Sequence, residues 1–98
     1  MSNQIDFRLK HEVKENIDVS TPSNIKLGKN IFDKKEVEIT EYSENKIRAF
    51  VLGGERRKVE FVSSQSGLRW KCTCKNDQKT FCKHAIALGF EIMHTQLI

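Results

Sequence analysis

Residues 68–93 read LRWKCTCKNDQKTFCKHAIALGFEIM, and this stretch decides how the chain folds. It contains Cys72 and Cys74 one residue apart, then a spacer of seven residues, then Cys82 and His84 one residue apart. In an extended segment the side chains at i and i+2 face the same way, so the first pair can direct both thiolates at one ion. Residues i and i+2 of a helix point to nearly opposite sides, so Cys82 is expected before a helix and His84 in its first turn.

This set of donor atoms suits zinc. Structural zinc sites take four ligands in a tetrahedron, with sulfur at about 2.3 Å and nitrogen at about 2.0 to 2.1 Å, and a Cys₃His set leaves no open position. Buried thiols without metal seldom fall into two such pairs, and the histidine and the short spacer argue against an iron-sulfur centre. We therefore predict one structural Zn²⁺, with Cys72, Cys74, Cys82 and His84 as its ligands.

The sequence that follows the cluster predicts a helix. Residues 85–93 are almost wholly apolar, and Ile86, Phe90 and Met93 lie at i, i+4 and i+7. Such a helix needs apolar cover on most of its sides, so we expect it to pack against a sheet.

The sequence that precedes the cluster alternates apolar and polar residues, which predicts three antiparallel strands. The alternating positions are Val37 and Ile39, then Ile47, Ala49 and Val51, then Val59 and Phe61. Residues 43–45 supply the first turn and Gly53 and Gly54 the second, where glycine tolerates a positive φ. A fourth short strand over residues 68–72 then leads into the cysteines, so the prediction is a small β-meander of three to four strands.

Two helices are expected before the sheet. The first, over residues 3–17, has an apolar stripe at a spacing of four, formed by Ile5, Leu9, Val13 and Ile17. The second runs from Pro22 to about Asp33, because a hydroxyl residue can cap its start and proline suits its first position. Gly28 costs this helix about 1 kcal/mol relative to alanine, so tertiary packing is expected to hold the helix, and a glycine at this position permits close approach of a neighbouring backbone.

These elements predict an α+β fold in which two N-terminal helices precede the meander, the zinc site lies at the end of the sheet, and a C-terminal helix follows. A chain of 98 residues that is 38% hydrophobic can bury one modest core, so we expect a single domain over residues 1–98. Within it, residues 1–35 form the helical segment and residues 36–98 the meander with its zinc finger.

The cysteines and the N-terminus also indicate a compartment. Three cysteines cannot all pair internally, and a disulfide between residues one apart is strained, so metal ligation in a reducing compartment is favoured. The opening residues contain no uninterrupted apolar run of the kind found in signal peptides or membrane spans. The expectation is an intracellular protein, cytoplasmic or in the nucleoid or nucleus, without membrane association.

The positive charge belongs to the half of the chain that carries the cysteines. Residues 1–46 hold 8 basic and 9 acidic side chains, whereas residues 47–98 hold 9 basic and 4 acidic ones, a net +5. A basic half is typical of proteins that contact polyanions, although a solvated surface explains it equally well. The candidate nucleic-acid contacts are Arg48, Arg56, Arg57, Lys58, Arg69, Lys71, Lys75, Lys79 and Lys83.

The arrangement C-x-C, variable loop, C-x-H, continuing as an apolar helix, resembles the SWIM zinc finger. The resemblance covers about residues 47–93, and Gly28 with the strand that ends at Gly54 resembles what often precedes the finger in longer members. It implies a β-hairpin that leads to the first pair and a helix that carries the second, with Cys72, Cys74, Cys82 and His84 as ligands. The family is associated with DNA binding and with protein contacts in helicases, transposase-like proteins and recombination complexes.

Two classes of function follow. The first is a module that binds DNA or another nucleic acid through its basic surface, with Trp70 and Phe81 either stacked on bases or, as is commoner beside a zinc site, buried in the core. The second is an adaptor for a protein partner, which the stripe of the first helix would favour if it were exposed. An enzyme acting on a small-molecule substrate is not expected, because four protein ligands saturate the zinc.

Overall fold

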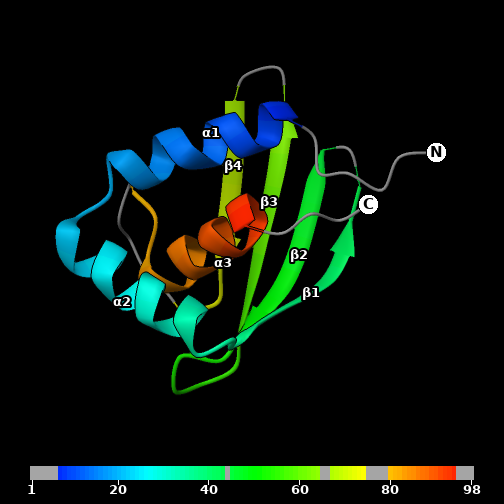
Figure 1. Cartoon of the computed structure of the whole chain (residues 1–98). Coiled ribbons are helices and arrows are strands. Elements are labelled where there is room, and N and C mark those ends of the chain that lie inside the picture. The colour runs from blue at the N-terminus through cyan, green and yellow to red at the C-terminus, as the bar shows by residue number, and fades with distance from the viewer. Residues whose placement is uncertain (1–6, 44, 65–66, 75–79, 95–98) are drawn as a thin grey trace.

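The computed structural model describes residues 7–43, 45–64, 67–74 and 80–94, with residues 7–9 described by their backbone. It confirms the α+β class, with helices before and after an antiparallel sheet (Figure 1). The elements are α1 (Phe7–Asp18), α2 (Pro22–Asp33), β1 (Val37–Tyr42), β2 (Lys46–Val51), β3 (Arg57–Ser64), β4 (Gly67–Cys72) and α3 (Lys83–His94).

The sheet is a four-stranded meander in the order β1-β2-β3-β4, with every neighbouring pair antiparallel. Its register places Ile47 opposite Phe61 and Phe61 opposite Trp70, so these side chains share one face. Ile47 and Phe61 are fully buried, whereas their neighbours along the strands are half-buried or exposed. The predicted alternation is therefore confirmed, with one face of the sheet turned to the core.

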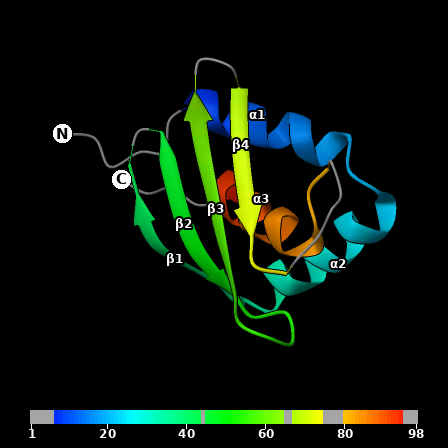
Figure 2. The same ribbon diagram turned by 180° about the vertical axis from the view of Figure 1, so that it is seen from behind.

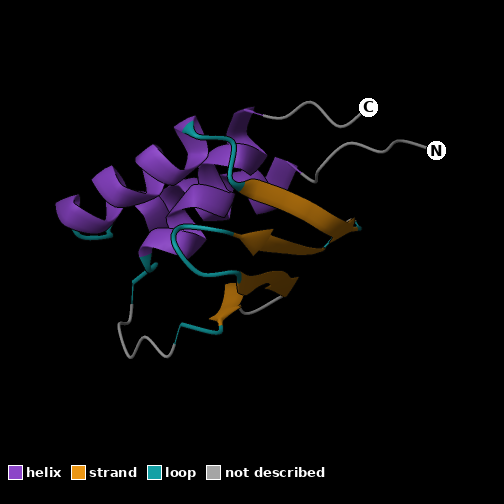
Figure 3. Cartoon of the chain, turned by 90° about the horizontal axis from the view of Figure 1, so that it is seen from below, coloured by secondary structure: helices purple, strands orange, loops and turns teal. Residues whose placement is uncertain are grey.

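All three helices lie on that buried face, so the molecule has two layers (Figures 2 and 3). The helix α3 lies across the sheet between α1 and α2, and its buried residues occur on almost every side. Its apolar composition is explained by this position, because α3 contacts both other helices and all four strands. The opposite face of the sheet is not covered by any described helix.

The first helix closes over α3. Val13 is fully buried and Ile17 nearly so, and both side chains approach the backbone of α3 at Gly89. These two members of the apolar stripe therefore cover the chain's own core. The side chain of Leu9 and the whole of Ile5 lie outside the described residues, as does the predicted start of the helix at residue 3.

The second helix has the predicted bounds. Thr21 caps it, because its hydroxyl accepts a hydrogen bond from the N–H of Asn24 at 3.3 Å, and Pro22 occupies the first turn. Gly28 is buried where α2 crosses α3, and a Cβ atom added there would lie 2.8 Å from the Lys83 carbonyl oxygen. The predicted close approach of backbones at this glycine is confirmed.

Candidate metal centre and basic sheet face

The two pairs of the cysteine cluster meet at the end of the sheet. The strand β4 ends at Cys72, a turn follows through Cys74, and α3 begins one residue after Cys82. One ligand atom from each of Cys72, Cys74, Cys82 and His84 can be chosen so that all four lie within 4.8 Å of one another. The Nδ1 atom of His84 lies 3.7 Å from Cys72 Sγ and 3.9 Å from Cys82 Sγ.

These distances fit a tetrahedral zinc ion. With ligand bonds of about 2.0 to 2.3 Å, the edges of such a tetrahedron are roughly 3.5 to 3.8 Å long. Both sulfur-to-nitrogen distances fall at or close to this range, and Nδ1 is the imidazole nitrogen that faces the thiols. Soft thiolates with one imidazole are the donor set that zinc prefers in structural sites.

Backbone pairing with β3 holds the first pair in place. The Thr73 N–H donates to the Lys58 carbonyl at 3.2 Å, and the Lys58 N–H donates to the Thr73 hydroxyl at 3.0 Å. The Arg57 guanidinium donates to the Thr73 carbonyl at 3.3 Å. The turn between the two cysteines is thereby attached to the start of β3.

Helix packing holds the second pair. The Ile86 N–H donates to the Cys82 carbonyl at 3.0 Å, which places Cys82 at the N-terminal end of α3 as the sequence predicts. The Asn24 side chain of α2 donates to the Phe81 carbonyl at 3.3 Å. The Phe81 ring is fully buried and stacks on Phe61 with ring centroids 5.1 Å apart, so the residue before Cys82 is anchored in the core.

Proximity changes the acidity of two thiols in opposite directions. The hydrogen bond from the Cys72 thiol lowers the pKa of Cys82 to about 4, although burial acts in the opposite direction. The same hydrogen bond raises the pKa of Cys72 above the usual range for a thiol, and burial adds to the increase. At neutral pH the metal-free site therefore holds a thiolate at Cys82 and a proton at Cys72.

Zinc affinity is expected to rise with pH, because Zn²⁺ must displace the proton that Cys72 retains. The rise should be about tenfold per pH unit for each proton displaced. Competition against a chelator of known zinc affinity, repeated at several pH values, measures this slope. A zinc affinity independent of pH around neutrality would contradict the assignment of a protonated Cys72.

The family model of the SWIM zinc finger matches residues 51–88 of the chain. The matched segment runs from the end of β2 through the cysteine cluster into α3, and it includes the four clustered residues. This part of the chain matches the SWIM zinc finger, and the match together with the Cys₃His cluster supports zinc as the cofactor. Searches among curated proteins and among solved structures gave no significant match.

The structure gathers most of the predicted basic contacts on the helix-free face of the sheet. Lys58, Arg69 and Lys71 are exposed there, and within the described part of the chain none of them forms an ion pair. Lys83 lies at the start of α3 on the other side of the sheet. Lys75 and Lys79 lie outside the described residues.

Three predicted arginine contacts already have partners. The Arg48 guanidinium lies 2.6 Å from Glu60 and 3.3 Å from Glu41, and its hydrogen bond lowers the pKa of the Glu60 carboxyl. Arg57 pairs with Glu55 and donates to Thr73. Arg56 lies over the Phe50 ring, 3.8 Å from its centroid.

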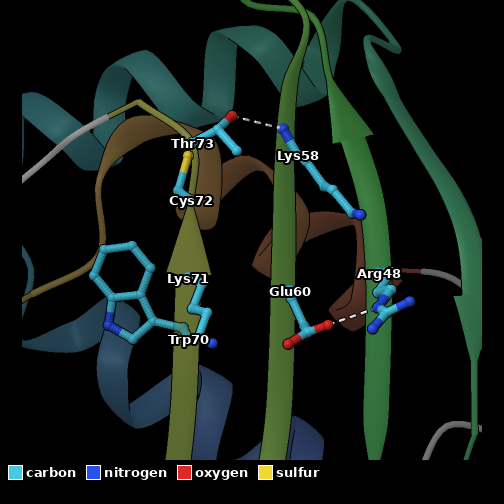
Figure 4. A pocket seen from close by; sticks show the side chains of 7 residues that line it. All are labelled: Arg48, Lys58, Glu60, Trp70, Lys71, Cys72 and Thr73. Carbon is cyan, nitrogen blue, oxygen red and sulfur yellow. Dashed lines mark hydrogen bonds and ion pairs between the residues drawn. The ribbon is translucent and has the colours of Figure 1, made fainter.

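A hollow of about 710 Å³ opens on the helix-free face beside the zinc site. Its lining includes Lys58, Glu60 and Lys71 from the middle of the face and Trp70 and Cys72 at one side (Figure 4). The metal centre and the basic face are therefore adjacent, since Cys72 belongs to the ligand cluster and also borders the hollow.

Sequence reasoning missed two supporting residues, Thr73 and Asn24. Their hydrogen bonds join segments 15 and 57 residues apart, and no local pattern marks such pairings. The sequence also places Arg57 and Lys58 far from the ligands, whereas the sheet register brings both against the turn between Cys72 and Cys74. A test of charge alone therefore needs side chains that do not support this turn.

Proposed function

We propose that Cys72, Cys74, Cys82 and His84 coordinate one structural Zn²⁺ and that the module binds nucleic acid, DNA in the first instance, through the helix-free face of its sheet. Four protein donors saturate a tetrahedral ion, so the zinc organises the fold and activates no water or substrate. The proposal is thus a binding module without catalytic activity of its own.

One observation carries the nucleic-acid proposal. Exposed cations from two adjacent strands, Lys58 of β3 with Arg69 and Lys71 of β4, lie together on a face with no described helix over it. Such a cluster attracts phosphates because binding releases the counterions that surround a polyanion. The hydrogen bond from Arg48, and after it the charges of Arg48, Lys46 and Lys71, lower the pKa of the Glu60 carboxyl, so several cations surround the one acid at the middle of the face.

The alternative proposal is an adaptor that contacts a protein partner and no nucleic acid. Its strongest sequence argument was the stripe of the first helix, but Val13 and Ile17 are buried against α3. Among the residues whose burial the structure describes, the large apolar side chains that remain exposed are Val19, Leu27 and Leu52. Among the described residues, no helix is long and apolar enough to cross a membrane.

We also infer that the helical segment and the finger fold as one domain. The core cluster joins Val13 and Ile17 of α1, Ile31 of α2, and residues of the sheet and α3 without interruption. In addition, Asn24 of α2 bonds directly to the segment that carries Cys82. The zinc site is expected to depend on both parts.

Replacing Lys58, Arg69 and Lys71 by alanine is expected to weaken binding to DNA of any sequence. Each lost phosphate contact should also reduce the slope of log affinity against log salt by about 0.7 for single strands or about 0.9 for duplex. A titration of labelled DNA at several salt concentrations measures both quantities. Lys58 is suitable because its bonds to Thr73 use its backbone, which the substitution leaves unchanged.

The matched control removes the same charge elsewhere. Lys14, Lys26 and Lys34 are exposed on or beside the helices, and their replacement by alanine should leave binding close to that of the parent protein. Zinc content and the melting curve are compared in all three proteins. If the parent shows no salt-dependent binding near physiological ionic strength, the nucleic-acid proposal fails and the adaptor takes its place.

A further inference from the structure

We propose that the helix-free face, together with the edge of β4 beside it, is built for a single-stranded nucleic acid, with the Trp70 ring at that edge stacking on an unpaired base next to a narrow line of phosphate contacts. This inference rests on the proposed function and adds the form of the ligand. Trp70, the charge pattern of the face and the position of the helices each contribute to it.

The exposed cations on the strands of this face lie toward one side. Lys58 lies on β3 and Arg69 and Lys71 on β4, and none of the three forms an ion pair with another described residue. Across the sheet, β1 carries Glu38 and Glu41, both exposed, and Glu41 pairs with Arg48 of β2. A track of cations on two strands with acids along the opposite edge suits one phosphate backbone, whereas the second backbone of a duplex would meet the acidic edge.

Trp70 is placed to meet a base. Its register opposite Phe61 starts its side chain on the helix side of β4, but β4 is an edge strand, so the half-buried Trp70 borders both the hollow of about 710 Å³ and a neighbouring one of about 190 Å³. In Figure 4, which views the sheet from its helix-free side, the indole lies beside β4 with its ring turned toward the viewer. The buried Phe81 ring meets it edge-on with centroids 5.4 Å apart, which supports the indole in this position.

A second aromatic surface lies on the helix-free face itself. Phe50 of β2 pairs in register with Lys58 of β3, and the Arg56 guanidinium covers its ring. A guanidinium plane stacked on a ring offers a flat cationic surface on which bases stack. Trp70 and the Arg56–Phe50 pair thus lie on either side of Lys58, a combination of cations and flat surfaces typical of single-strand binding.

The described elements offer little for reading a duplex. Base edges of B-form DNA are reached by a helix or ribbon that enters a groove, whereas α1, α2 and α3 all lie on the other side of the sheet. Stacking on the Trp70 ring needs a base that is free of its neighbours, which a base inside an intact duplex is not.

The test uses the natural fluorescence of the zinc-loaded chain, because Trp70 is the only tryptophan in the sequence. A homopyrimidine DNA strand, the same sequence as a blunt duplex, and the corresponding RNA strand are titrated in turn at one salt concentration. We expect the single strands to quench the Trp70 emission and to bind at least about tenfold more tightly than the duplex.

Two variants separate stacking from packing. Trp70→Leu keeps an apolar side chain against Phe81 but removes the large ring, so single-strand affinity should fall about tenfold or more while the affinity for duplex changes little. Trp70→Phe retains a smaller ring and should recover part of the loss; an end label on the strand reports binding for both variants. Zinc content and melting temperature show whether each variant is folded.

The outcomes discriminate between the two proposals. Preference for single strands, quenching of Trp70 and selective loss in Trp70→Leu support the inference, whether DNA or RNA binds better. Equal or tighter salt-dependent binding to duplex with unchanged Trp70 emission overturns the inference and leaves the proposed function standing. Absence of salt-dependent binding to all three probes overturns both.

Discussion

Removal of zinc is expected to abolish the cooperative unfolding transition of this chain. The proposed ligands belong to the end of β4 and the start of α3, so the ion joins the sheet to the central helix. Structural zinc contributes about 10 to 16 kcal/mol of apparent binding free energy in zinc-finger peptides, whereas the net stability of a folded domain is only about 5 to 15 kcal/mol. The metal-free chain should therefore lose its native packing.

The variant Cys82→Ser tests this expectation without a chelator. A serine hydroxyl is a poor zinc ligand, and the remaining three donors do not complete the tetrahedron. We expect zinc content well below one ion per chain and loss of a sharp melting transition. Thr80→Ser, two residues earlier and outside the cluster, introduces the same side chain and should keep both properties.

Cobalt provides a spectroscopic measure of the same site. Co²⁺ in the parent protein should give the absorption of a tetrahedral ion with thiolate charge-transfer bands, and Cys82→Ser should weaken these bands. A metal analysis without zinc, or a chelated protein with an unchanged melting curve, would show that the core holds the fold by itself and would remove the proposed structural role.

Local signals explain how much of the fold was predictable. The bounds of α2 follow from Thr21 and Pro22 at its start, and the four strands follow from alternation and from turn residues such as Gly54, whose φ is +103°. The position of His84 in the first turn of α3 follows from the spacing within the second pair. Each of these features is determined by residues that are close in sequence.

Features that depend on long-range packing were not predictable. Alternation shows which residues share a face, but only the packing of all three helices on the Phe61 side leaves Lys58 and Lys71 open to solvent. For the same reason the sequence could not show which of the nine predicted basic contacts lie on the helix-free face and which support the structure. Arg57 supports the turn beside the zinc site and Arg56 covers Phe50, while their neighbour Lys58 has its side chain on the open face.

The metal centre and the helix-free face share one strand, which links the stability of the fold to nucleic-acid binding. The strand β4 ends at Cys72 and carries Arg69 and Lys71 on the opposite face. Loss of zinc should disorder the metal centre and the helix-free face together. Weak nucleic-acid binding by a zinc-free sample would therefore not test whether Arg69 and Lys71 contact the nucleic acid. Every binding comparison therefore needs proteins of equal zinc content.

The variant Gly28→Val is expected to destabilise the protein by about 3 kcal/mol or more through overpacking. A Cβ atom at Gly28 would lie 2.5 Å from Ile86 Cγ2 and 2.8 Å from the Lys83 carbonyl oxygen. The carbonyl belongs to the backbone of α3 and cannot rotate away, so the two helices must separate. Lys83 lies between Cys82 and His84, so this separation should also weaken zinc binding.

Gly89→Val is the matched control, because Gly89 is likewise in the middle of a 12-residue helix and the change in helix propensity is the same. A Cβ atom there would meet the Ile17 and Val13 side chains at 2.8 and 3.0 Å, and the end of the Ile17 side chain can move. The expected loss is about 1 to 2 kcal/mol with zinc affinity close to normal. Denaturant unfolding and chelator competition measure the two effects, and equal losses in both variants would show that the contact between α2 and α3 has no special bearing on the metal centre.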